Sequence, residues 1–215
     1  MWRAPICLVA ITDRHRMVAP ETLAGGDWAA VAREFGAAIA AVTAPGVLVQ
    51  VREKDLDGGP LLALVQAALA TGAHVVVNDR LDVALVAGAH GVHLPERGLS
   101  IESARGIAAS RASGDFTVGA SCHSIEGAHA AADAGADLVQ LGPIWDSPGK
   151  GPPLGPPALA AARSGLRAGA RLVAVGGVDG DDRARLALRS GADAVAAIRA
   201  VWANRLDIGR ALAGV

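Results

Sequence analysis

Short runs of β-branched and other apolar residues recur along the chain at regular intervals. Between them lie Ala-rich stretches in which apolar side chains return every three or four positions, as in Trp28, Val31, Phe35 and Ile39, the spacing of one helix face. Most of the apolar runs lack strict polar alternation, which is typical of parallel strands buried on both faces. The pattern predicts strands at Ile6–Thr12, Val47–Glu53, His74–Asp79, Gly91–Glu96, Thr117–Cys122, Leu138–Pro143, Leu172–Gly177 and Ala194–Arg199.

Three of the predicted helices end in a similar five-residue motif: AGAHG at 87–91, AGADL at 134–138 and SGADA at 190–194. We expect the glycine of each motif to cap its helix before the chain enters the next strand. A β/α unit repeated eight times in a chain of this length predicts an α/β fold, a closed (β/α)8 TIM barrel, as a single domain over residues 1–215. A doubly wound open sheet is the alternative, but no G-x-G-x-x-G follows the first strand to favour it.

Composition narrows the class of protein. Of 215 residues, 52% are hydrophobic and 19% charged, which excludes a disordered chain. The formal net charge of −1 argues against a nucleic-acid-binding surface, which needs a basic excess. No apolar run approaches the roughly 20 residues that cross a bilayer, and the opening residues lack a signal-peptide cleavage site. The two cysteines, Cys7 and Cys122, give neither a disulfide framework nor a zinc-ligand set. We therefore expect a cytoplasmic protein.

The basic residues are unusually uneven, because only Lys54 and Lys150 are lysines among the twenty Lys and Arg residues. Lysine is a compact point charge and arginine a planar fork, so the two are not interchangeable at a phosphate site. Both lysines follow predicted strands. The catalytic face of a barrel is the C-terminal end of its strands, and we expect both lysines to lie there.

The other polar residues after the predicted strands point to phosphate. Four cations would meet in one cavity: Arg52, Lys54, Lys150 and Arg199. Ser147 and the backbone of Gly176 and Gly177 offer neutral donors near strands 7 and 8, where barrels often bind phosphate. Cations and neutral donors together are suited to a phosphorylated substrate.

A magnesium site is expected beside these cations. Asn78 and Asp79 follow the third predicted strand, and Mg²⁺ usually binds one or two carboxylates together with phosphate oxygens. Simpler interpretations stay open for single residues. Asp79 would serve equally as the N-cap of a helix, Gln50 and Arg52 as a salt-bridged ring inside the barrel, and His93 as a hydrogen-bonded core histidine.

At these residues the sequence resembles the thiamine-phosphate synthase and thiazole tautomerase superfamily, whose fold is a (β/α)8 barrel. The resemblance extends over nearly the whole chain, and Q-x-R-E-K-D followed by N-D-R is its most specific part. The synthase joins 4-amino-5-hydroxymethyl-2-methylpyrimidine diphosphate to a thiazole phosphate and releases pyrophosphate. The matching segments are 10–14, 49–55, 77–80, 91–94, 119–123, 142–144 and 174–178.

The resemblance implies a role for each matching residue on the diphosphate side. Gln50, Arg52 and Lys54 match the motif that binds the pyrimidine diphosphate, and Asn78 and Asp79 match the diphosphate and Mg²⁺ position. The departure of pyrophosphate leaves a pyrimidine cation, so cations and Mg²⁺ around the leaving group would lower the barrier most.

Among the other matching residues, Ser121 matches a substrate-binding serine and Lys150 the lysine that contacts pyrophosphate. Ser147 and Gly177 match positions that hold the thiazole phosphate. The chain departs from the family at Arg199, where a serine is common and where we expect an arginine to change the geometry of the phosphate site.

Two further departures leave alternatives open. Gly98 stands where the synthase usually carries a second Mg²⁺-binding aspartate, with Glu96 nearby, and Ser147 and Gly149 stand where two threonines are usual. The tautomerase, an isomerase, needs no pyrophosphate chemistry, and its histidine at the position of His123 acts as a general acid and base. A barrel that binds a phosphorylated ligand without turnover is the non-enzymatic alternative.

The oligomeric state is suggested only by two tryptophans near the chain ends. Trp2 and Trp202 are candidate contacts of a homodimer, although packing of a helix explains them equally well.

Overall fold

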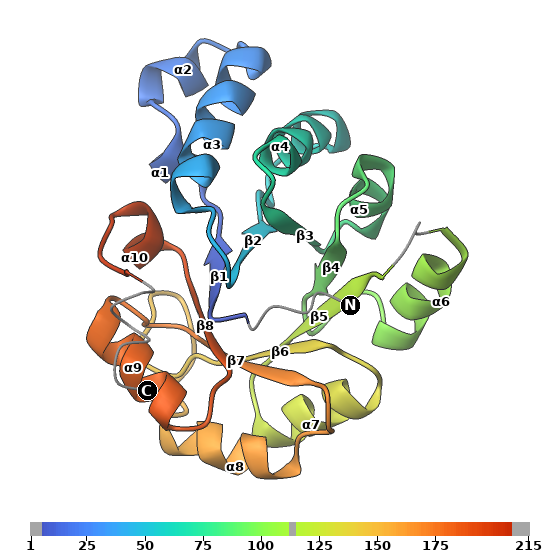
Figure 1. Cartoon of the computed structure of the whole chain (residues 1–215), viewed down its shortest axis with the longest axis vertical. Helices are drawn as coiled ribbons and strands as arrows, with labels where there is room; N and C mark the ends of the chain where they lie inside the picture. The colour runs from blue at the N-terminus through green and yellow to red at the C-terminus, as the bar shows by residue number, and fades with distance from the viewer. Residues whose placement is uncertain (1–5, 112–114, 208–215) are drawn as a thin grey trace.

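The computed structural model describes residues 6–111 and 115–207 and contains a closed barrel of parallel strands in chain order (Figure 1). The predicted fold is confirmed, and so is each of the eight predicted strands. Most end one or two residues earlier than predicted, because the chain leaves the ladder where the polar loop residues begin. The strands are β1 Leu8–Ile11, β2 Val47–Val51, β3 His74–Asn78, β4 Gly91–Leu94, β5 Thr117–Cys122, β6 Leu138–Leu141, β7 Arg171–Val175 and β8 Ala194–Ala197.

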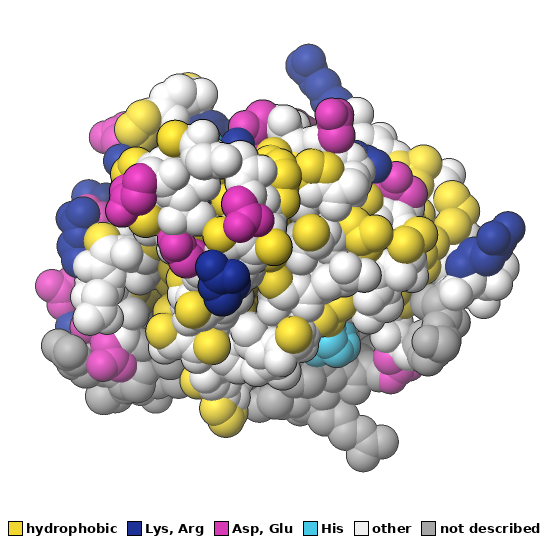
Figure 2. All heavy atoms as spheres, turned by 90° about the horizontal axis from the view of Figure 1, so that it is seen from above, with side chains coloured by type: hydrophobic (Ala, Val, Ile, Leu, Met, Phe, Trp, Pro, Cys, Tyr) yellow, Lys and Arg dark blue, Asp and Glu magenta, His cyan; other side chains and the backbone are white. Residues whose placement is uncertain are grey.

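Helices surround the ring of strands (Figure 1). On the outer face seen in Figure 2, hydrophobic atoms are mixed with scattered charged side chains. Among the described helices, none is long and apolar enough to cross a membrane. The helices are α1 Arg14–Met17, α2 Pro20–Ala24, α3 Trp28–Val42, α4 Gly58–Ala70, α5 Leu81–Ala87, α6 Ile101–Arg111, α7 Ile125–Asp133, α8 Pro157–Gly165, α9 Asp181–Arg189 and α10 Arg199–Trp202.

The barrel interior is apolar at the N-terminal end of the strands, and at their C-terminal end it is polar on one side and apolar on the other. Successive strand residues point to opposite faces, and the inward-facing residues nearer the strand starts pack as one apolar cluster that includes Val9, Leu48, Val76, Leu138 and Val173. On β2 to β6, the next inward-facing residue, two positions further along the strand, is polar. These residues are Gln50, Asn78, His93, Ser121 and Gln140. On β7, β8 and β1 they remain apolar. The floor of the C-terminal end is therefore half polar and half apolar.

The three repeated motifs at the helix ends share one structural function. His90, Asp137 and Asp193 each accept a hydrogen bond from the backbone N–H of the second residue of the preceding strand. The donors are Val75 at 3.1 Å, Val118 at 2.8 Å and Leu172 at 2.7 Å, respectively. The glycine of each motif has a left-handed φ: 69° at Gly88, 104° at Gly135 and 105° at Gly191, as the prediction of capping requires. The motifs thus join each helix end to the start of its neighbouring strands.

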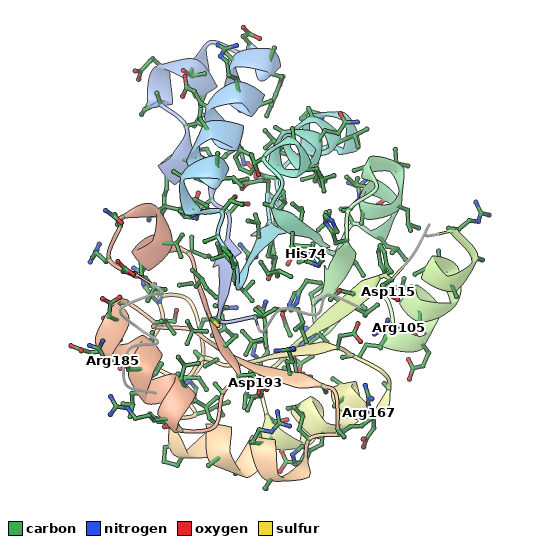
Figure 3. All side chains as sticks on the ribbon, viewed as in Figure 1. His74, Arg105, Asp115, Arg167, Arg185 and Asp193 are labelled. Carbon is green, nitrogen blue, oxygen red and sulfur yellow. The ribbon has the colours of Figure 1, made fainter. Side chains whose placement is uncertain are left out.

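Arginines at this end of the barrel are neutralised by the same aspartates. Arg105 of α6 donates to the Asp137 carboxylate, and Arg163 of α8 donates to Asp193 Oδ2 at 2.7 Å. Arg105 and Asp193 are labelled in Figure 3. The charges of Arg105 and Arg163 at the N-terminal end are therefore paired.

Trp202 has an internal role. Its Nε1 donates to the carbonyl oxygen of Ile11 at 2.7 Å, which ties α10 to the end of β1, and its ring packs half-buried against the core. Helix packing therefore accounts for Trp202, while Trp2 lies outside the described residues.

Candidate active site

A cavity of about 510 Å³ opens at the C-terminal end of the barrel. It brings together every predicted site residue except Asp79. Both lysines lie on this face, as predicted. The predicted residues that line it are Gln50, Arg52, Lys54, Asn78, Ser121, His123, Ser147, Lys150, Gly176, Gly177 and Arg199.

Five cations line the cavity, and we call them the cation cluster: Arg52, Lys54, Lys150, Arg199 and Arg205. Within the described residues, none of these side chains forms a hydrogen bond or an ion pair. Elsewhere many arginines are paired with carboxylates, as Arg105 and Arg163 are. Unpaired positive charge gathered in one concavity is suited to a polyanion. The sequence had given no reason to select Arg205, which follows α10.

The cations of the cluster affect one another. The charge of Arg52 is the largest cause that lowers the pKa of Lys54, followed by partial burial and the charge of Lys150, while Asp79 raises it. Lys54 therefore lies in a positive field that a bound anion would relieve.

A chain of amides crosses the polar half of the floor. Gln140 Nε2 donates to Gln50 Oε1 at 2.6 Å, and Gln50 Nε2 donates to Asn78 Oδ1 at 3.2 Å. The alternative of a salt-bridged ring is therefore wrong for Gln50, and Arg52 is left free. Sequence reasoning missed Gln140, although a lone glutamine inside the apolar run Leu138–Leu141 was a usable signal.

His93 is a buried, hydrogen-bonded histidine, as the simpler interpretation expected. Its side chain is 1% exposed and its Nε2 lies 2.9 Å from Ser121 Oγ. Burial, with a smaller contribution from the charge of Arg52, lowers the pKa of His93 to about 3. A neutral imidazole beneath the cavity thus orients the Ser121 hydroxyl without adding positive charge.

His123 lies at the rim of the same cavity, exposed, with its Nδ1 at 2.6 Å from the carbonyl oxygen of Gly142. Because a carbonyl only accepts, Nδ1 carries the proton. The long loop between β6 and α8 supplies Ser147 and Lys150, which one turn joins through the Lys150 N–H and the Ser147 carbonyl at 3.1 Å. This loop borders the cavity through Ser147 and Lys150.

The glycine pair after β7 forms a turn that no other residue would fit. Gly176 and Gly177 have φ values of 91° and 73°. A Cβ on Gly176 would lie 2.7 Å from the Pro143 Cα, and one on Gly177 would lie 2.5 Å from the Trp145 Cβ. Neither the Gly177 N–H nor the Val178 N–H makes a hydrogen bond within the described residues. The turn therefore leaves neutral donors beside the cavity.

Asp79 lies outside the cavity lining, exposed, with a φ of 65°. The N-cap alternative is wrong, because the N-cap of α5 is Arg80 and no side chain caps that helix. The Asp79 carboxylate has no hydrogen bond or ion pair with any described residue. A Cβ built on Gly98 would lie 3.1 Å from Asp79 Oδ1, which places position 98 directly beside it.

The donor set permits magnesium only in a shared site. No group of three or more His, Cys, Asp or Glu side chains able to hold a metal exists among the described residues. Mg²⁺, however, is commonly bound by one or two carboxylates while substrate phosphates and waters supply the rest. The free carboxylate of Asp79, close enough to Lys54 to affect its pKa, fits a metal held jointly with a diphosphate.

The residues after β1 support the site from behind. Thr12 Oγ1 donates to Glu53 Oε1 at 2.7 Å and accepts from the Arg52 N–H at 2.9 Å. Arg14 donates to Glu53 at 3.1 Å and to both Asp55 oxygens, at 2.7 and 2.5 Å. This cluster therefore holds the 52–55 loop, which carries two of the cations.

Comparisons with known proteins agree with this geometry. The family model described as "Thiamine monophosphate synthase" matches residues 24–201. A thiamine-phosphate synthase of Anaeromyxobacter dehalogenans is 45% identical over 157 residues, 71% of this chain and 68% of that protein. One of Methanospirillum hungatei is 31% identical over 194 residues, 87% of this chain and 82% of that protein. A solved thiamine phosphate pyrophosphorylase from Pyrococcus furiosus superposes with a TM-score of 0.73 at 25% identity, covering 99% of this chain and 100% of its own.

Proposed function

The chain belongs to the thiamine monophosphate synthase family, and from that premise we propose that it joins 4-amino-5-hydroxymethyl-2-methylpyrimidine diphosphate to a thiazole phosphate with release of pyrophosphate. It is a transferase of thiamine biosynthesis acting on phosphorylated small molecules. The observation that carries the proposal is the cation cluster, because five unpaired charges in one cavity match two phosphorylated reactants better than one. The comparisons give no support to the tautomerase or to a non-catalytic barrel.

The first step breaks the bond between the pyrimidine methylene carbon and the diphosphate oxygen. The electron pair leaves with pyrophosphate, so negative charge grows on the leaving group and positive charge on the methylene. Arg52, Lys54 and Lys150 line the cavity and carry no counter-charge among the described residues, so their positive charges would stabilise the leaving pyrophosphate. His93 stays neutral beneath the pyrimidine cation, because its pKa is lowered to about 3.

The second step forms a bond between the thiazole nitrogen and the methylene carbon. The nitrogen supplies both electrons, and the product carries the positive charge on the thiazolium ring. Holding the two reactants in one cavity removes the entropy cost of their encounter. The orientation of the acceptor is assigned to Ser121, which His93 holds, and to the phosphate donors Ser147, Gly176, Gly177 and Arg199.

Magnesium is part of the proposal. Asp79, with Asn78 beside the diphosphate, is the residue that would hold the ion, which would neutralise charge on the leaving pyrophosphate. With Asp79 as the expected protein carboxylate, the protein alone should bind Mg²⁺ weakly and should bind it with the diphosphate. Calorimetric titration of Mg²⁺ with and without inorganic pyrophosphate tests this independently of turnover.

The decisive experiment is a coupling assay with both phosphorylated precursors, run with and without Mg²⁺. We expect Arg52→Ala and Lys150→Ala each to lose about 10²–10³ in rate, the usual cost of removing one charge-stabilising donor, with little change in melting temperature. Arg189→Ala, which removes an exposed charge on α9, is the matched control. Rates within a few-fold of wild type would contradict the proposed pocket.

A second pair of variants separates the synthase from the tautomerase. Asp79→Asn should abolish coupling and His123→Ala should be mild if the chain is a synthase. A Mg²⁺-independent isomerisation blocked only by His123→Ala would favour the tautomerase. Tight binding of both precursors with no product at saturating Mg²⁺ would favour a non-catalytic barrel.

Two further parts of the proposal concern the surroundings of the protein: a cytoplasmic location and a homodimer. Light scattering on the purified chain tests the second. A monomer at micromolar concentration would contradict it.

A further inference from the structure

Arg183 lies on α9, outside the cavity, yet it contacts three parts of the acceptor side. Its Nη1 donates to the carbonyl oxygen of Gly177 at 2.6 Å and forms an ion pair with Asp179 Oδ2 at 3.2 Å. Its guanidinium lies over the ring of Trp145, 5.5 Å from the ring centroid. Trp145 belongs to the loop after β6, so one side chain joins that loop to the turn after β7.

The hydrogen bond to Gly177 fixes the direction of a peptide group. The carbonyl of Gly177 and the N–H of Val178 belong to the same planar unit, and in a trans peptide they point in opposite directions. Of the described peptide bonds, the cis one is Gly142–Pro143, so the 177–178 unit is trans. While Arg183 holds the oxygen on the α9 side, the Val178 N–H points the opposite way.

That N–H has no partner in the described part of the chain, and both Gly177 and Val178 line the cavity. Glycine at φ 73° gives the unit freedom to rotate, so an anchor is needed to keep the donor in place. We propose that Arg183 is a positioning residue, which orients the Val178 N–H toward the phosphate of the thiazole acceptor. This inference rests on the proposed function.

The arginine side chain suits this role in a way lysine does not. Its planar fork donates in fixed directions and stacks on an aromatic face, so it holds the carbonyl, the carboxylate and the ring together. The next arginine of the helix, Arg185, instead pairs with Asp182 within α9 and is labelled at the periphery of the barrel in Figure 3. Arg189 has neither a hydrogen bond nor an ion pair from its side chain within residues 6–111 and 115–207, which makes it a control of equal charge.

The test compares two acceptors, the thiazole phosphate and the same thiazole alcohol without phosphate. In Arg183→Met we expect the KM for the phosphorylated acceptor to rise about tenfold, the loss of roughly one hydrogen bond to an anion. The KM for the alcohol, the KM for the pyrimidine diphosphate and kcat should stay within about twofold. Arg183→Lys should recover part of the loss, and Arg189→Met should resemble wild type.

The outcomes separate this inference from the proposed function. Absence of coupling in the wild-type chain contradicts the proposed function itself. If the wild-type chain couples the two precursors but the ratio of the two acceptor KM values is unchanged in Arg183→Met, the positioning role is overturned. If Arg183→Met is too unstable to assay, Arg183→Lys is measured alone, and an unchanged ratio in that folded variant also overturns it.

Discussion

Replacing Gly177 by alanine tests whether the turn after β7 is as constrained as its geometry indicates. The residue has a φ of 73°, where an L side chain costs about 1–2 kcal/mol. The new Cβ would also lie 2.5 Å from the Trp145 Cβ and 2.9 Å from the Asp146 oxygen. Neither neighbour is the end of a flexible side chain, so the loop after β6 must move, at an overpacking cost of about 1–3 kcal/mol. We therefore expect Gly177→Ala to lower the free energy of unfolding by about 2–5 kcal/mol.

Gly169 offers a matched control. Its φ is 88°, and a Cβ there would meet nothing within 4 Å. Gly169→Ala should therefore cost only the backbone part, about 1–2 kcal/mol. Urea denaturation of both variants measures the difference, which isolates the collision with the loop.

The same two variants should also differ in catalysis. Gly177→Ala should raise the KM for the thiazole phosphate, because Ser147 and Lys150 are carried by the displaced loop, whereas Gly169→Ala should leave it unchanged. Equal destabilisation by the two substitutions, or an unchanged KM in Gly177→Ala, would refute the reasoning.

Three other predictions follow from groups in or near the cavity. The pKa of His93 is lowered to about 3, so on acidification the unfolded chain takes up a proton that the folded state does not. Between about pH 6.5 and 3 this residue should therefore lower the free energy of unfolding by about 1.4 kcal/mol for each pH unit of acidification. Acid denaturation of His93→Gln should be correspondingly less steep. Pyrophosphate should bind the protonated form of Lys54, so its affinity should fall as the pH rises through a pKa below the usual 10.5, and titration calorimetry should find this dependence absent in Lys54→Arg. Gly98→Asp would bring a second carboxylate beside Asp79, but its Cβ would lie 2.8 Å from the Pro95 Cδ. We expect this variant to bind Mg²⁺ more tightly in the presence of pyrophosphate and to have a lower melting temperature. An unchanged affinity for Mg²⁺ would contradict the placement of position 98 beside Asp79.

The barrel was predictable because its strands are continuous apolar runs bounded by polar residues. The run at Thr117–Cys122 was predicted to the residue, whereas Val47–Glu53 was predicted two residues too long, since Arg52 and Glu53 belong to the loop that Thr12 and Arg14 hold. An alternating pattern does not distinguish the last residue of a strand from the first residue of a binding loop.

The cavity was predictable for residues that follow strands, because a barrel brings all its strand ends to one face. Two further cavity residues were missed, Gln140 inside β6 and Arg205 after α10. Arg183 was also missed, because its partner is a backbone carbonyl that has no sequence signature. The metal site stays a prediction, and Asp79 is the one ligand that the sequence named for it, because the remaining ligands would come from the substrate and water.

The contrast between the two ends of the barrel has a kinetic consequence. Arg105 and Arg163 at the N-terminal end are paired with Asp137 and Asp193, while the cation cluster at the other end is unpaired. Unpaired positive charge is thus concentrated at the cavity of a chain whose net charge is −1. Anionic reactants would be steered to one end although the whole molecule would repel them weakly. Their association rate constants should therefore fall as ionic strength rises, the opposite of what net charge alone would give.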